Sequence, residues 1–185
     1  MRVGIGFDVH RLAAARRLVL GGVEIPFTHG LEGHSDADVL LHAIADAVLG
    51  ALGEGDIGRH FPTTDARYKN VESTRLLKSV AGMMEKRGYR LSNLDATVVA
   101  AAPLLAPHVP LMRKTIGGIL GADPGRISIK ATTHEGLDAL GRGEGIAAYA
   151  VVLLERRAGR RERRPARSRS IKARGNTKMR SKRNA

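Results

Sequence analysis

The N-terminal residues alternate between large apolar positions and small or polar positions, which predicts a β-strand over residues 2–10. One face of this strand is apolar, with Val3, Ile5, Phe7 and Val9. The opposite face carries Gly4, Gly6, Asp8 and His10. Because glycine has no side chain, we expect another segment or a ligand to approach this second face closely.

Residues 37–52 have the pattern of a buried α-helix, with apolar side chains around most of its circumference. Ser35 and Asp38 resemble a capping box and predict that the helix begins at about residue 37. A polar stripe with four-residue spacing interrupts the apolar surface, at Asp38, His42 and Asp46. A buried polar stripe needs partners, which a metal, a phosphate or a site water would provide. The alternative is that His42 is an ordinary core histidine.

Turn residues and apolar periodicity divide the rest of the chain into short elements. They predict a hairpin over residues 18–25, helices over about 72–87 and up to about 120, and strands at 94–102, 126–131 and 146–154. Residues 26–34 and 55–65 read as loops. This order predicts a single α+β domain, in which a mixed β-sheet has helices packed on one face.

The positive charge of the chain is confined to its C-terminal end. Residues 156–185 contain 14 of the 31 lysines and arginines but 1 of the 18 acidic residues, so they carry the whole net charge of +13. We therefore predict a folded domain over residues 1–155 and a disordered basic tail over 156–185. A basic tail without aromatic residues predicts non-specific binding to polyanions rather than sequence-specific recognition.

Two absences narrow the chemistry and the location. The sequence has no cysteine, so a zinc site would have to use histidine or carboxylate ligands. No apolar run approaches the roughly 18 residues that cross a bilayer, and the first residues form a strand pattern rather than an apolar leader. We therefore expect a soluble cytoplasmic protein that has no membrane segment.

Asp8, His10 and His42 are the best candidates for metal ligands. Asp8 and His10 project from the same side of one strand, and a facing helix would bring His42 to them. Imidazole nitrogen and carboxylate oxygen are both zinc ligands, and three protein ligands leave one position open for a substrate. The alternative is a strand end whose polar side chains make ordinary hydrogen bonds.

Polar loops supply a second group of candidates. Asp56 and Asp65 lie among glycines and threonines, and Thr132, Thr133 and Glu135 follow the strand over 126–131. Hydroxyl and backbone N–H groups bind phosphate, whereas a carboxylate beside them would repel it unless a cation lay between. Glu135 therefore predicts a magnesium ion bridging a polyphosphate, with a helix cap as the alternative.

Taken together, the motifs resemble the 2-C-methyl-D-erythritol 2,4-cyclodiphosphate synthase family of the non-mevalonate isoprenoid pathway. The resemblance covers residues 1–155, in motifs that keep the family's order. They are Gly-Phe-Asp-Val-His at 6–10, His-Ser-Asp-Ala-Asp at 34–38 with His42, Gly-Asp-Ile-Gly at 55–58, Phe-Pro at 61–62, Ala-Pro at 102–103, Lys-Ala-Thr-Thr-His-Glu at 130–135 and Gly-Arg-Gly-Glu-Gly-Ile-Ala at 141–147.

The resemblance implies a homotrimer with active sites between neighbouring subunits. It implies a lyase that cyclises 4-diphosphocytidyl-2-C-methyl-D-erythritol 2-phosphate and releases CMP. Zinc, or another divalent cation, would be held by Asp8, His10 and His42, and magnesium or manganese by Glu135 with the substrate diphosphate. Two cations suit this reaction, because the attacking and the attacked groups are both anionic. His34 and Thr133 match the residues that stabilise the transition state.

The resemblance also assigns substrate contacts. Around the metal and the erythritol these are Asp8, Val9, His10, His34, Ser35, Asp56, Ile57, Gly58, Phe61, Pro62, Thr63, Thr64 and Asp65. Around the cytidine and the diphosphate they are Ala100, Ala101, Ala102, Pro103, Leu104, Leu105, Ala106, Thr132, Thr133, His134, Glu135 and Arg142.

Several positions leave alternatives open. Leu104 and Ala139 stand where many members have Lys and Phe, which puts one contact at each position in doubt. Asp46 is expected either to orient His42 or to be a surface charge. Arg142 and Glu144 match residues near the trimer axis, where members can hold an isoprenoid phosphate; the alternative is an exposed ion pair.

Two other classes of protein are alternatives to the cyclase. A zinc hydrolase would activate water at the same metal and would need a base, for which Asp38 or Asp56 is the candidate. A nucleic-acid-binding protein is suggested by the tail alone. Release of CMP from the cytidine substrate separates the cyclase from both.

Overall fold

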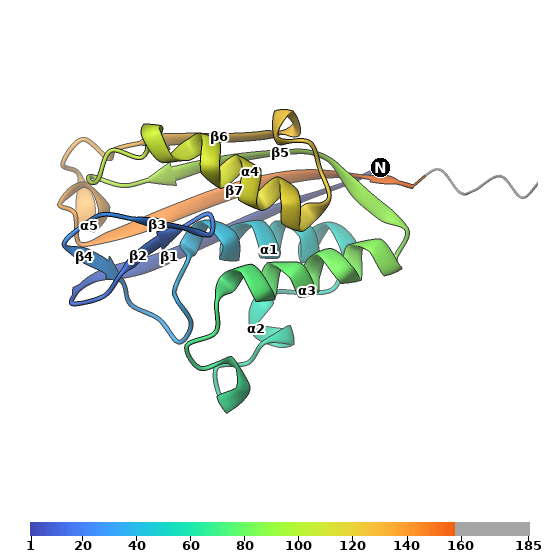
Figure 1. Cartoon of the computed structure of the whole chain (residues 1–185), viewed down its shortest axis with the longest axis horizontal. Helices are drawn as coiled ribbons and strands as arrows, with labels where there is room; N and C mark the ends of the chain where they lie inside the picture. Colours follow the sequence, from blue (N-terminus) through green and yellow to red (C-terminus); the bar gives the residue numbers. More distant parts are fainter. Residues whose placement is uncertain (158–185) are drawn as a thin grey trace, which may run out of the picture.

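A five-stranded mixed sheet forms the centre of the protein (Figure 1). The computed structural model describes residues 1–157. In spatial order the strands are β4 (His29–Leu31), β1 (Arg2–Ala14), β7 (Gly145–Arg156), β5 (Tyr89–Val99) and β6 (Ile127–Thr132). β5 and β6 run parallel, whereas the other neighbours are antiparallel. The predicted hairpin is also present, as β2 (Leu18–Leu20) and β3 (Val23–Ile25). The predicted mixed sheet is confirmed.

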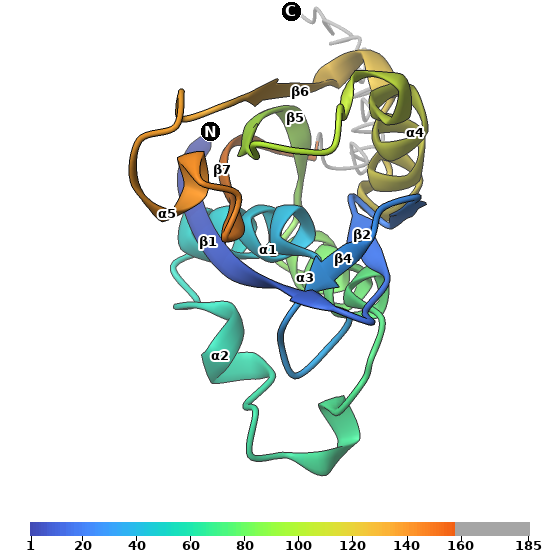
Figure 2. The same cartoon turned by 90° about the vertical axis from the view of Figure 1, so that its left-hand side faces the viewer.

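The helices form a layer on one side of this sheet (Figure 2). The longer ones are α1 (Val39–Leu52), α3 (Ser73–Lys86) and α4 (Val109–Leu120). α1 lies directly on β1 and β7, α3 packs on α1, and α4 packs against α3 and β6. Two short helices, α2 (Ile57–His60) and α5 (Asp138–Gly141), fall in segments whose composition indicated loops. The arrangement is the single α+β domain that the pattern predicts.

Glycines on β1 determine how closely α1 approaches the sheet. A Cβ atom added to Gly4 would lie 2.0 Å from the carbonyl oxygen of Ala47, and one added to Gly6 would lie 2.0 Å from that of Ala43. Both glycines are buried, so the small face of the strand is the inner one, as expected. The outer, apolar face is exposed: Ile5 keeps 71% of its surface accessible.

α1 is the core helix that its composition indicated. Every residue in it is buried except His42, Asp46 and Gly50. Burying these leucine, isoleucine and valine side chains stabilises the fold by about 1.5–3 kcal/mol for each one. Of the predicted polar stripe, only His42 and Asp46, which lie one turn apart, are therefore partly accessible.

The predicted start of α1 is wrong by two residues. Ala37 has φ of 57°, a left-handed conformation that cannot belong to the helix. The N-cap is Asp38, whose carboxylate accepts from the backbone N–H groups of Leu41, Gly21 and Gly22. Burial raises the pKa of Asp38 to about 6, although these three bonds act against the rise. Asp38 thus joins α1 to the β2–β3 hairpin and does not share a site with His42.

Two strands also differ from their predicted bounds. β1 continues past His10 because its last residues pair with β4, which lies inside the segment taken for a loop. β5 begins five residues earlier than expected and ends at Val99. A register shift between Leu91 and Asn93 breaks the alternation there, which explains why the pattern concealed the start of the strand.

No helix within residues 1–157 is long and apolar enough to cross a membrane. The predicted tail lies outside the described residues, apart from its first two positions.

Candidate functional site

Asp8, His10 and His42 come together where α1 crosses β1. The Nε2 atom of His10 lies 3.0 Å from Oδ2 of Asp8 and 3.2 Å from Nδ1 of His42, and that Nδ1 lies 2.9 Å from the same Oδ2. A tetrahedral zinc ion with bonds of about 2.0 Å has ligand atoms about 3.3 Å apart. The three atoms therefore converge at the spacing that one metal ion requires.

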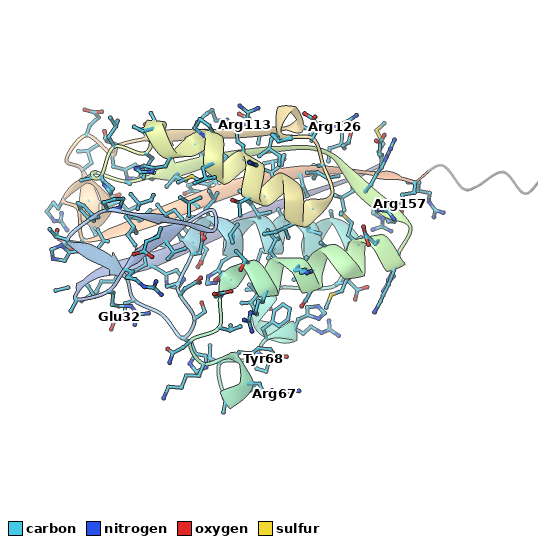
Figure 3. The ribbon with its side chains drawn as sticks, in the orientation of Figure 1. Glu32, Arg67, Tyr68, Arg113, Arg126 and Arg157 are labelled. Atoms are coloured by element: carbon cyan, nitrogen blue, oxygen red, sulfur yellow. The ribbon has the colours of Figure 1, made fainter. Side chains whose placement is uncertain are left out.

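The remaining polar atoms of Asp8 and His10 are occupied in a way that directs the ligand atoms inward. Nδ1 of His10 donates to the carbonyl oxygen of Glu32 at 2.8 Å, which places the proton of a neutral His10 ring on Nδ1. The Nε2 atom of His10, which faces Asp8, would then have a free lone pair for a metal ion. Oδ1 of Asp8 accepts from the Val9 N–H at 2.9 Å. Figure 3 shows Glu32 near the edge of the fold formed by β4 and the end of β1.

The electrostatics of the trio favour a bound cation. Burial would raise the pKa of Asp8, but hydrogen bonds and positive charge from His10 and His42 hold that pKa well below its usual range. Burial would likewise lower the pKa of His10, yet Asp8 raises it above its ordinary value. The negative charge of Asp8 thus draws positive charge to this point, and a divalent cation would replace the protons.

Neither of the two roles expected for Asp46 is observed, because it makes no hydrogen bond to His42 and it is half-buried rather than a surface charge. Oδ1 of Asp46 accepts from the backbone N–H of Ile57 at 2.7 Å, and it therefore fixes the start of α2. Burial raises the pKa of Asp46. The second ring nitrogen of His42, Nε2, instead lies 2.8 Å from Oγ of Ser73, the first residue of α3. Asp46 consequently holds the wall of the site rather than the metal ligand.

A cavity of about 220 Å³ opens beside the three ligands. Predicted site residues provide most of its lining: Asp8, His10, His34, Ser35, His42, Ile57, Gly58, Phe61 and Thr63. Asp46, Tyr68, Val71 and Leu76 complete it. The Phe61 ring meets the Tyr68 ring edge to face at 5.4 Å, and Tyr68 projects from the lower loop beside Arg67 (Figure 3). Apolar side chains thus enclose one side of a polar site, and they come from a loop that has no apolar periodicity in the sequence.

His34 is the residue of this cavity whose bonding is incomplete. Its Nε2 atom is buried and has no hydrogen-bond partner among residues 1–157. Buried polar atoms without partners are uncommon and usually meet a water, an ion or a ligand. The position of His34 is therefore the one expected of a group that contacts a bound substrate.

The other predicted erythritol contacts do not line this cavity, although most of them lie next to lining residues in the sequence. Asp56 caps α2 by accepting from the Arg59 N–H, and Asp65 pairs with Arg67, which lowers the pKa of Asp65. Pro62 and Thr64 belong to the same exposed loop, while Val9 points to the outer face of β1. One chain thus leaves these five residues outside the cavity, and the carboxylate of Asp56 is already used as a helix cap.

A second hollow, of about 240 Å³, lies at the ends of β5 and β6. It is lined by eight of the twelve residues predicted around the cytidine and the diphosphate, together with Ala131: Ala100, Ala101, Ala102, Pro103, Leu104, Leu105, Thr132 and Thr133. Ala106 follows immediately and begins a short 3₁₀ helix. The two hollows share no residue. One chain therefore does not bring the residues of the predicted site into a single pocket.

The predicted second metal ligand lies outside both hollows. Glu135 has φ of 50° and accepts from the Thr133 hydroxyl at 2.7 Å. His134 pairs with Asp138 at 2.9 Å, and Arg142 pairs with Glu144 at 2.7 Å as an exposed ion pair. Within residues 1–157, the group with metal-binding geometry is Asp8, His10 and His42 alone.

The arrangement of Asp38 argues against a base for hydrolysis at this position. Its two carboxylate oxygens accept three backbone N–H groups, and its side chain is fully buried at the end of α1. It does not line the cavity beside the metal ligands. Asp38, one of the two candidate bases for the alternative zinc hydrolase, is therefore not placed to activate water at these ligands.

Known proteins resemble this chain along the whole folded part. The 2-C-methyl-D-erythritol 2,4-cyclodiphosphate synthase of Geobacter sulfurreducens is 62% identical over 155 residues, which are 84% of this chain and 99% of that protein. The synthase of the same name from Syntrophomonas wolfei is 59% identical over 155 residues, with the same two coverages.

Solved structures agree with the sequence comparison. The bifunctional IspDF of Campylobacter jejuni has a TM-score of 0.81 at 44% identity, covering 84% of this chain and 42% of that one. IspF of Plasmodium falciparum, in complex with CDP, has a TM-score of 0.75 at 33% identity, covering 84% and 96%. The YgbB family matches residues 1–155. The resemblance seen in the motifs is confirmed, and this chain belongs to the YgbB family.

Proposed function

We propose that this protein is a 2-C-methyl-D-erythritol 2,4-cyclodiphosphate synthase. It converts 4-diphosphocytidyl-2-C-methyl-D-erythritol 2-phosphate into 2-C-methyl-D-erythritol 2,4-cyclodiphosphate and CMP. The observation that carries the proposal is the convergence of Asp8, His10 and His42 on one point, in a fold whose relative is 62% identical over 155 residues.

The reaction needs no nucleophile from the protein. An oxygen of the 2-phosphate forms a bond to the β-phosphorus, the bond from that phosphorus to the bridging oxygen breaks, and the electron pair leaves with CMP. Asp8, His10 and His42 would hold a divalent cation, which would supply Lewis-acid polarisation to a substrate phosphate. His34 contributes a buried ring nitrogen toward the cavity, and the aromatic pair Phe61 and Tyr68 limits access of water.

Measurement of CMP release tests the proposal and separates it from hydrolysis. The purified protein with zinc and magnesium is given the natural substrate and, separately, the analogue that lacks the 2-phosphate. A cyclase releases CMP from the first alone, because the attacking group is the 2-phosphate itself. A zinc hydrolase releases CMP from both. No CMP from the natural substrate would contradict the proposal.

We propose that the active site is completed between subunits of a homotrimer. Two observations support this: the predicted residues divide between two hollows of one chain, and the outer face of β1 and β7 is apolar and exposed. Ile5 and Val151 pair across the two strands, with 71% and 43% of their surfaces accessible. An apolar sheet face of this kind indicates a buried interface.

Placing a charge on this face is expected to dissociate the assembly. Ile5→Glu should shift the mass measured by light scattering from three chains to one and abolish CMP release, because a buried unpaired carboxylate opposes association. Leu111→Glu is the matched control, since Leu111 is 52% exposed on α4, away from this face. A wild-type monomer with full activity would contradict the shared site.

The proposed magnesium ligand is tested by Glu135→Gln. This change keeps the shape and removes the charge, so zinc content should persist while the dependence of rate on magnesium or manganese weakens. We expect the rate to fall about 100-fold, the loss typical of a ligand or its support. Metal analysis and CMP release against magnesium concentration measure the two effects. If rate and magnesium response stay unchanged, Glu135 only accepts from Thr133.

The basic tail is proposed to bind polyanions without taking part in catalysis. A chain ending at Arg157 should keep its assembly and its rate of CMP release, and should elute from heparin at lower salt than the full chain. The reason is counterion release, which makes the binding of basic residues to a polyanion steeply dependent on salt. Loss of activity in the shortened chain would place the domain boundary beyond residue 155.

A further inference from the structure

His42 is joined to α3 by a hydrogen bond on the side away from the other metal ligands. Its Nε2 atom lies 2.8 Å from Oγ of Ser73, whereas the hydroxyl of Ser35 is farther away, at 3.3 Å. Ser73 is 0% exposed, so water does not compete for this bond. The ring of His42 therefore has one nitrogen in the metal site and the other in a dry contact with Ser73.

Asp36 determines which way the hydroxyl of Ser73 points. Oδ1 of Asp36 accepts a hydrogen bond from that hydroxyl, and Oδ2 accepts from the backbone N–H of Ser73 at 3.1 Å. A carboxylate can only accept, so the Ser73 proton is directed at Asp36. The Ser73 oxygen is left to accept from His42, which places the ring proton of His42 on Nε2. The lone pair of its Nδ1 is then free for a metal.

The partners of this chain of bonds are held in place by the backbone. The N–H of Asp36 donates to the carbonyl oxygen of Val71 at 3.2 Å, and the N–H of Asn70 donates to that of His34 at 2.8 Å. These bonds join the segment before α1 to the segment before α3. The carboxylate of Asp36 also lies at the N-terminus of α3, where the helix dipole favours a negative charge.

We propose that Ser73 and Asp36 are positioning residues that fix the proton of His42 on Nε2 and aim its Nδ1 at the metal. This inference rests on the proposed metal site. It assigns to Ser73 and Asp36 the role that spacing suggested for Asp46. A ligand histidine whose outer nitrogen loses its partner typically binds metal 10–100-fold more weakly, because the ring is free to change tautomer and orientation.

The test measures metal binding itself, by competition with a chelator of known affinity, in the full-length protein. Ser73→Ala is expected to weaken zinc binding about 10–100-fold and to change the visible absorption of the cobalt-substituted protein. Ser73→Thr keeps the hydroxyl and should retain wild-type affinity and spectrum. Asp36→Asn should weaken binding in the same direction. Ser79→Ala, a change on the exposed face of α3, is the matched control and should alter neither measurement.

The outcomes separate this role from simple packing. If Ser73 serves only the core, threonine should disturb its buried position at least as much as alanine, and zinc affinity should follow melting temperature. Rescue by threonine together with loss in alanine supports the positioning role. If Ser73→Ala does not fold, Asp36→Asn decides. Wild-type affinity and cobalt spectrum in a folded Ser73→Ala or Asp36→Asn would overturn it. Absence of zinc binding by the wild type would instead contradict the proposed metal site.

Discussion

His42→Ala is expected to lose the zinc ion and nearly all CMP release while the protein remains folded. His42 lies on the partly exposed edge of α1, and alanine is compatible with the helix, so stability should change little. Without the metal the site loses several kcal/mol of transition-state stabilisation, which corresponds to a rate about 1,000-fold lower. Metal analysis, circular dichroism and CMP release measure the three quantities.

A second histidine serves as the control for this change. His29→Ala alters an exposed residue of β4 that does not line the cavity, and it should leave zinc content and rate unchanged. Full zinc occupancy in His42→Ala would show that this residue is not a ligand. The experiment is informative even without the natural substrate, because zinc content is measured on the protein alone.

The metal ligands could be predicted because local periodicity places them. Alternation puts Asp8 and His10 on the same face of the strand as Gly4 and Gly6. The two glycines allow a helix to pack closely on this face, and the polar edge of that helix then meets Asp8 and His10. The same rules produced the sheet, the hairpin and the core helix. The strand bounds were less predictable, since a bulge alters the start of β5 and the short partner β4 extends the end of β1, without a signal in their own residues.

The groups that support the ligands could not be found in this way. Ser73 and Asp36 are 37 residues apart and meet only because two segments without regular structure are joined by backbone bonds. A serine at the start of a predicted helix is common as a cap, so the sequence carries no signal of the contact between Ser73 and His42. Asp46 has the right spacing for the role, yet it bonds to Ile57. Residue spacing predicts which side chains share one face of a helix, but it does not predict which residues of other segments pack against that face.

The contact between Gly6 and α1 leads to the prediction with the largest expected effect on stability. Gly6→Ala would place a Cβ atom 2.0 Å from the carbonyl oxygen and 3.0 Å from the carbonyl carbon of Ala43, and 2.7 Å from the nitrogen of Ala47. Helix backbone cannot rotate away as a side chain can. We expect the free energy of unfolding to fall by about 4 kcal/mol or more, as for other severe core changes.

Gly50→Ala is the matched control because it adds the same methyl group to the same helix–strand contact. The nearest atom, the Ile5 carbonyl oxygen, would be 3.8 Å away, and alanine is preferred over glycine inside a helix. This variant should therefore be more stable than the wild type by about 0.5–1 kcal/mol. Urea unfolding of both variants measures the difference. Equal stability would mean that α1 can move away from β1 at little cost.

If Gly6→Ala does fold, it should also bind zinc more weakly. The carbonyl that the new methyl group would displace belongs to Ala43, the residue after His42. Any shift of α1 away from β1 therefore separates His42 from Asp8, whose atoms are 2.9 Å apart in the native arrangement. Zinc affinity, measured below the temperature at which the variant melts, should fall at least about tenfold, in line with the loss expected when a ligand is displaced. A folded Gly6→Ala with native zinc affinity would show that the spacing of α1 and β1 does not control the metal site.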